Sequence, residues 1–108
     1  MNATLRTLLI AAAVTVSGSA LAAGDAEAGK KKAEPCKACH GEIGVSATGD
    51  FPILAGQNAD YIAHVLGHYK NGKRKNPIMQ GQVANLKPQD MLDLAAWFSS
   101  QQGLKVKY

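Results

Sequence analysis

The stretch Cys36-Lys37-Ala38-Cys39-His40 restricts most strongly what this chain of 108 residues can fold into. Two thiols at this spacing lie on roughly one side of a helical turn, where both can add to the two vinyl groups of one porphyrin. A histidine directly after the second thiol is then held beneath the ring, with its imidazole within reach of the iron. The stretch therefore predicts one covalently bound c-type haem, with Cys36 and Cys39 as thioether residues and His40 as an axial ligand.

The cysteine pair has three other interpretations. A dithiol redox centre belongs beside a βαβ pattern, and no strand-like run flanks this pair. A structural zinc site needs four Cys or His ligands, whereas the chain has only two cysteines and the other histidines lie far along it. A simple disulfide or a chance pair gives no special place to the histidine that follows. The haem interpretation uses all three residues.

The N-terminal residues predict export. Arg6 precedes a short apolar run, and Ala20-Leu21-Ala22 matches a signal-peptide cleavage site. Residues 1–22 are therefore predicted to be a cleaved signal peptide and residues 23–108 one periplasmic domain; an uncleaved N-terminal anchor is the alternative. No later segment approaches the 20 or so apolar residues of a membrane span. A domain of this size buries little apolar surface by itself, and a covalent cofactor would supply much of its core.

Helical periodicity and cap residues predict an all-α domain. The first expected helix is 25–39, with a kink or break before Cys36 caused by Pro35. The second is 59–70, capped by Asn58 and stopped by Gly72. The third is 88–101, opened by Pro88. Loops are expected over 41–57 and 73–87. The apolar stripe of the second helix is Tyr61, Ile62, Val65, Leu66 and Tyr69, and that of the last is Met91, Leu94, Ala95 and Phe98.

Methionine and histidine are the usual second ligands of haem iron, so the remaining methionines and histidines are the candidates. His64 and His68 fall on the face opposite the apolar stripe of their helix. They are expected to be solvated there, and binding of a stray metal is the alternative. Met91 falls in an apolar stripe and is expected to fill the core. Met79, between a proline and a glycine, remains as a candidate ligand; core filler and an open iron site are the alternatives.

The chain over residues 23–108 resembles small bacterial class I cytochromes c. The resemblance rests on an ordered series: Gly29, Cys36 to Gly41, Phe51 to Gln57, Tyr61, Tyr69 to Arg74, Asn76 to Met79, Asp90-Met91 and Leu94 to Phe98. It implies three main helices with loops wrapped around one haem, Cys36 and Cys39 as attachments, His40 as proximal ligand and Met79 as distal ligand. It also implies that the Pro52 carbonyl orients His40 and that Gly29 meets Trp97 where the terminal helices cross.

The expected function is that of a periplasmic electron carrier rather than an enzyme. The alternatives are a haem protein that binds or senses a ligand, or reacts with peroxide, after losing Met79, and a redox subunit dedicated to a larger enzyme. Expected partners are redox proteins, docked through basic residues near the haem edge; nucleic acid and membrane insertion are not expected. The basic residues are Lys30, Lys31, Lys32 and Lys37 beside the haem motif, and Lys70, Lys73, Arg74 and Lys75 before Met79.

Overall fold

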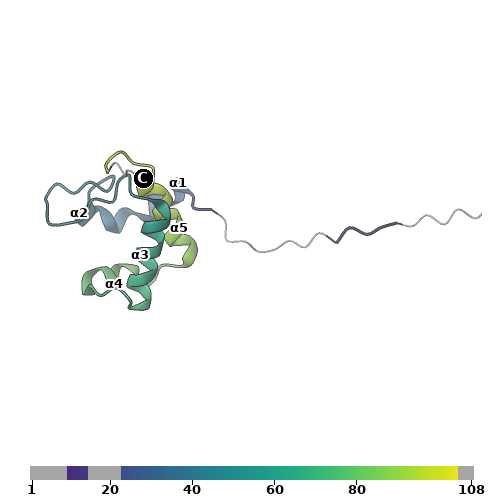
Figure 1. Ribbon diagram of the computed structural model, residues 1–108. Coiled ribbons are helices and arrows are strands. Elements are labelled where there is room, and N and C mark those ends of the chain that lie inside the picture. The colour runs from purple at the N-terminus through teal and green to yellow at the C-terminus, as the bar shows by residue number, and fades with distance from the viewer. Residues whose placement is uncertain (1–9, 15–22, 105–108) are drawn as a thin grey trace, which may run out of the picture.

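The computed structural model describes residues 10–14 and 23–104, and these residues form helices and loops with no strand. The elements are α1 (Ala26–Lys32), the 3₁₀ turn η1 (Glu34–Cys36), α2 (Lys37–His40), α3 (Ala59–Asn71), α4 (Pro77–Val83) and α5 (Pro88–Ser99). Helices α1 and α5 lie against each other, α3 packs on α5, and α4 lies at the far end of α3 (Figure 1). The predicted all-α fold is confirmed.

The predicted helix 25–39 is divided into three segments. Asp25 caps α1 by accepting hydrogen bonds from the backbone N–H groups of Glu27 and Ala28. Pro35 lies in η1, and the chain turns there before α2 carries Cys39 and His40. The break expected before Cys36 is therefore confirmed, because proline cannot donate the hydrogen bond that would continue α1.

Helix α3 begins and ends close to where the sequence predicts. Asn58 holds the N-cap position, and Gly72 ends the helix with a φ of 81°. Glycine adopts this left-handed conformation without the steric cost that other residues incur. The helix crosses α5 and leads to α4 at its C-terminal end (Figure 1).

The prediction of a loop over 73–87 is wrong, because residues 77–83 form the helix α4. The side chain of Asn76 accepts hydrogen bonds from the backbone N–H groups of Ile78 and Met79 at 3.0 and 3.1 Å. Pro77 occupies the first turn, where its missing N–H costs nothing. Met79 is therefore held on a capped helical turn rather than on a loop.

The core lies where α1, α3 and α5 meet. Its buried side chains are Ala33, Ile62, Leu94, Ala95 and Phe98. Gly29 is the point of closest approach between α1 and α5: an added Cβ would lie 1.9 Å from the Asp93 carbonyl oxygen and 2.8 Å from the Trp97 Cβ. The expected meeting of Gly29 and Trp97 is confirmed. Met91 is only half-buried, so its expected place in the core is wrong.

Asp93 is a buried residue of α5 that the apolar stripe did not predict; 3% of it is exposed. Its carboxylate accepts hydrogen bonds from the backbone N–H of Asp25 at 2.9 Å, from Gln89 at 2.9 Å and from the Lys32 ammonium at 2.6 Å. Lys32 also pairs with Asp90 at 2.8 Å. The charge of Asp93 is thus compensated by partners from both ends of the chain.

The predicted signal peptide, residues 1–22, lies outside the described residues except for 10–14. Within residues 10–14 and 23–104, no helix has both the length and the hydropathy of a membrane span.

Candidate functional site

A cavity of about 510 Å³ opens between α2, α3 and α4. A volume of this size is typical of ligand and cofactor pockets in proteins. Most of its wall is apolar, with side chains from the 41–57 loop, α3 and α5, such as Phe51, Ile53, Val65, Leu66 and Phe98. The sequence-predicted site residues Cys36, Cys39, His40 and Met79 all line this one cavity.

The short helix α2 positions the imidazole of His40. The residue is buried, with 8% exposed, and its Nδ1–H donates a hydrogen bond of 2.9 Å to the Pro52 carbonyl oxygen. A carbonyl oxygen can only accept, so this contact leaves Nε2 unprotonated in the neutral ring and able to bind a metal. The predicted orientation of His40 by Pro52 is confirmed.

The two thiols precede His40 on η1 and α2, and both are half-buried free cysteines. Burial raises the pKa of the Cys36 thiol, and the neighbouring Cys39 raises it further. Cys36 is therefore held as a protonated thiol at neutral pH. In that form it would supply both the sulfur and the hydrogen for a thioether bond to a vinyl group.

The remaining candidate ligands separate clearly in space. Met79, on the first turn of α4, lines the cavity and is half-buried, whereas Met91 does not line it. His64 and His68 do not line it either. Of the methionine and histidine side chains beyond His40, Met79 is the one among residues 10–14 and 23–104 that reaches this cavity.

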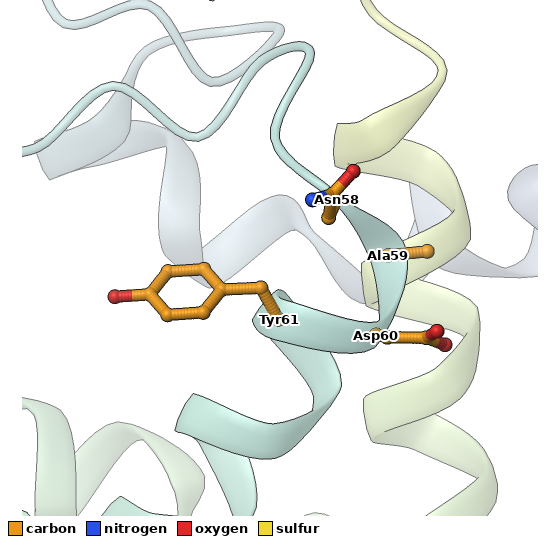
Figure 2. Close-up of a pocket in the computed structure, with 4 residues that line it drawn as sticks. All are labelled: Asn58, Ala59, Asp60 and Tyr61. Atoms are coloured by element: carbon orange, nitrogen blue, oxygen red, sulfur yellow. The ribbon is translucent and has the colours of Figure 1, made fainter. Parts of the chain in front are cut away.

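The apolar stripe predicted for α3 lines the cavity, and Ile62 and Leu66 also pack in the core between the helices. Tyr61, Ile62, Val65, Leu66 and Tyr69 all belong to the cavity wall, and only Ile62 is fully buried. Figure 2 shows the Tyr61 side chain leaving the start of α3 on a different side from Asp60. An amphipathic helix normally buries its apolar face. This one needs an apolar occupant in the cavity to do so.

Arg74 is a cavity residue whose role the sequence reasoning missed, because it was grouped with the surface lysines. Its guanidinium lies over the Tyr69 ring, 5.2 Å from the centroid. Hydrogen bonding to Tyr61, followed by interactions with Tyr69, raises the pKa of Arg74. The sequence signal for this role is that Arg74 closely follows α3, the helix whose apolar stripe lines the cavity. A fixed arginine of this kind suits a carboxylate group of a cavity ligand.

The sequence model described as cytochrome c matches residues 26–102. The chain belongs to the cytochrome c family. It is 46% identical over 101 residues to cytochrome c4 of Pseudomonas aeruginosa, an alignment that covers 94% of this chain and 49% of that protein. It is 39% identical over 83 residues to cytochrome c-554(548) of Halomonas halodenitrificans, covering 74% of this chain and all of that protein.

A crystal structure of reduced recombinant cytochrome c4 from Pseudomonas stutzeri superposes with a TM-score of 0.72 at 44% identity. The match covers 76% of this chain and 48% of the cytochrome c4 chain. The chain thus spans about half the length of the cytochromes c4 that it matches. The fold is the cytochrome c fold.

Members of the cytochrome c family bind haem c covalently, and Cys36 to His40 fit the attachment motif. The geometry of the cavity agrees with this cofactor. Two adjacent thiols, an imidazole with Nε2 left free and a thioether sulfur surround one apolar cavity, and an arginine suited to a carboxylate lies at its wall. The predicted cofactor, one haem c, is confirmed at the level of the family.

Proposed function

We propose that this protein carries single electrons between redox partners and is not itself an enzyme. Cys36 and Cys39 would hold the haem by thioether bonds, and His40 and Met79 would be the two ligands of its iron. The observation that carries the proposal is the convergence of these four side chains on one cavity whose other walls are largely apolar. Side chains of the protein would then take both of the iron positions at which a substrate could otherwise bind.

The chain's own residues orient these groups. The Pro52 carbonyl holds the His40 ring through Nδ1 and so directs Nε2 away from that contact. The Asn76 side chain holds the backbone of Met79 at the start of α4. The apolar residues of α3 and of the 41–57 loop would keep water away from a haem bound in the cavity. When bound, haem supplies an iron that alternates between the ferric and ferrous states, and a thioether ligand favours the ferrous state.

The same proposal places the protein in the periplasm, with residues 1–22 removed as a signal peptide and residues 23–108 as the working domain. Covalent attachment of haem outside the cytoplasm agrees with the apolar run and the cleavage site near the N-terminus.

The proposed partners are redox proteins with an acidic face. Several of the basic residues make contacts within the chain: Lys32 with Asp90 and Asp93, Lys37 with Glu34, and Lys70 with the Leu86 carbonyl. Docking is therefore proposed to rely mainly on Lys73 and Lys75, which are exposed just before α4. Electron-transfer rates should then fall as ionic strength rises, because exposed charges are screened over about 8–10 Å at physiological salt.

The axial-ligand assignment is tested by replacing each methionine in turn. Met79→Ala should abolish the absorbance band of the Met–iron bond in the oxidised protein and lower its reduction potential. Met91→Ala should keep the band and cost less than about 2 kcal/mol of stability, because Met91 is only half-buried. Retention of the band in Met79→Ala, with its loss in Met91→Ala, would contradict the assignment.

The same spectra separate electron transfer from the ligand-binding alternative. Wild-type protein with Met79 bound should bind carbon monoxide poorly in the ferrous state, whereas Met79→Ala should bind it readily. Ready binding of carbon monoxide by the wild type would show that the distal position is open.

A further inference from the structure

His64 and His68 are two metal-binding side chains that the haem site does not use. They lie one turn apart on α3, and neither lines the cavity. His64 is exposed and His68 is half-buried. Their rings are in contact, with centroids 4.1 Å apart and planes inclined by 61°.

We propose that His64 and His68 form a bidentate site for a late first-row divalent cation, with Cu²⁺ bound most tightly. Residues four apart on a helix point to the same side, which brings both imidazoles within reach of one ion. Neutral imidazole is a good ligand for copper, nickel and zinc, and affinity along this series peaks at Cu²⁺. Cu²⁺ prefers tetragonal nitrogen and oxygen ligands, so two adjacent imidazoles with water in the other positions satisfy it.

Water must complete the coordination sphere. Within the described part of the chain, no cluster of three or more His, Cys, Asp and Glu side chains is arranged to hold a metal. This sets the histidine pair apart from a structural zinc site, which needs four protein ligands. The exposure of His64 leaves room for water or for a small solution ligand on the outer side of the ion.

The charged residues near the pair have two opposite effects on metal affinity: they weaken competition by protons, and they repel the metal cation. Partial burial lowers the pKa of His68, and the nearby His64, Lys73 and Arg74 lower it further. Protons therefore compete less for the ring nitrogen of His68 that would bind the metal. Lys73 and Arg74 also repel a cation, while the exposed Asp60, one turn before His64, attracts it. Figure 2 shows the Asp60 side chain pointing to a different side of α3 from the cavity residue Tyr61.

The test titrates Cu²⁺ into the oxidised haem-loaded protein by calorimetry, with wild type, His64→Gln and His68→Gln compared. One ion should bind per wild-type chain. Each single substitution should lower the affinity by about 10-fold or more, since loss even of the groups that orient a metal ligand costs about 10–100-fold. Lys73→Gln is the matched control in the same neighbourhood: it keeps both ligands, removes a repelling charge and should raise the affinity.

Electron paramagnetic resonance of the bound Cu²⁺ supplies a second measurement. Hyperfine coupling to two nitrogens is expected in the wild type and to one in either single variant. The haem absorption spectrum, unchanged in both variants, checks that the fold is retained. Equal affinity in wild type and in the double variant His64→Gln/His68→Gln would overturn the proposal, as would coupling to a single nitrogen in the wild type.

Discussion

Gly29 shows how one residue sets the distance between the first and last helices. Its position in the middle of α1 lowers helix propensity, yet the backbone of Asp93 and the side chain of Trp97 lie where a Cβ would be. The hydrogen of glycine allows α1 and α5 to touch. The stability gained by packing α1 on α5 outweighs the helix propensity lost at Gly29, because α5 is the element that α1 mainly packs against.

Gly29→Ala is expected to destabilise the protein by about 1–3 kcal/mol, because the added methyl group would overlap a backbone carbonyl that cannot move alone. The free energy of unfolding in urea measures the effect. Gly67→Ala is the matched control: Gly67 lies within α3 with open space around it, so alanine should stabilise by about 0.5–1 kcal/mol. A Gly29→Ala variant as stable as wild type would contradict the close packing of α1 on α5.

Helix α4 carries Met79, the proposed distal ligand. It is only seven residues long, too short to be stable by propensity alone. The Asn76 cap and Pro77 at the first turn offset part of that deficit, and buried Val83 attaches the other end. The position of Met79 therefore depends on a cap three residues away.

Asn76→Ala is expected to cost about 0.5–2 kcal/mol of stability, the usual effect of losing an N-cap side chain. Because the lost hydrogen bonds hold the backbone of Ile78 and Met79, the Met–iron absorbance band should also weaken on warming at a lower temperature than in wild type. Asn76→Asp, which keeps an acceptor at the same position, should restore both properties. Loss of the band in Asn76→Asp as well would mean that capping is not the function of Asn76.

At the scale of the whole molecule, the hydrogen bonds and ion pairs around Asp93 join the first helix, α1, to the last helix, α5. Lys32 on α1 pairs with Asp90 and Asp93 on α5, and Asp93 also accepts from the backbone of Asp25. The Lys32 hydrogen bond, followed by those from Asp25 and Gln89, lowers the pKa of Asp93 to about 2 from an ordinary value of 3.8. Folding therefore favours the charged form of this carboxyl.

The sign of the resulting pH dependence follows from that lowered pKa. Above about pH 4 the carboxyl is charged in both the folded and the unfolded chain, and its contribution to stability is complete. As the pH falls from about 4 towards about 2, the unfolded chain takes up a proton before the folded one does, and the contribution is lost. Thermal unfolding between pH 6 and 2 should show this loss in the wild type.

Asp93→Asn should be less stable than wild type at neutral pH and should lose less stability on acidification. Lys32→Gln, which removes the largest cause of the lowered pKa, should move the acid loss to higher pH. Identical acid profiles for wild type and Asp93→Asn would rule out Asp93 as the source of the dependence.

The sequence alone determined the features that depend on neighbouring residues. The thiol pair and His40 lie within five consecutive positions, and the bounds of α3 and α5 follow from caps and helical periodicity over one helix each. The break at Pro35 is equally local. The seven-residue α4 was missed although Asn76 and Pro77 are a cap and a first-turn signal, because so short a helix has no long apolar period to support them.

Only the tertiary structure decided which side chains share an environment. Asp93 is buried because Lys32, 61 positions earlier, compensates its charge; no pattern within α5 shows this. Met79 lines the cavity and Met91 does not, and Arg74 lines it although it lies between two exposed lysines, because of how α3 and α4 pack. Periodicity gives the face of a helix but not what lies opposite that face. For α3 it is partly the core, where Ile62 packs, and partly the cavity, and the family's covalent haem explains why five apolar and aromatic residues of this helix line a cavity.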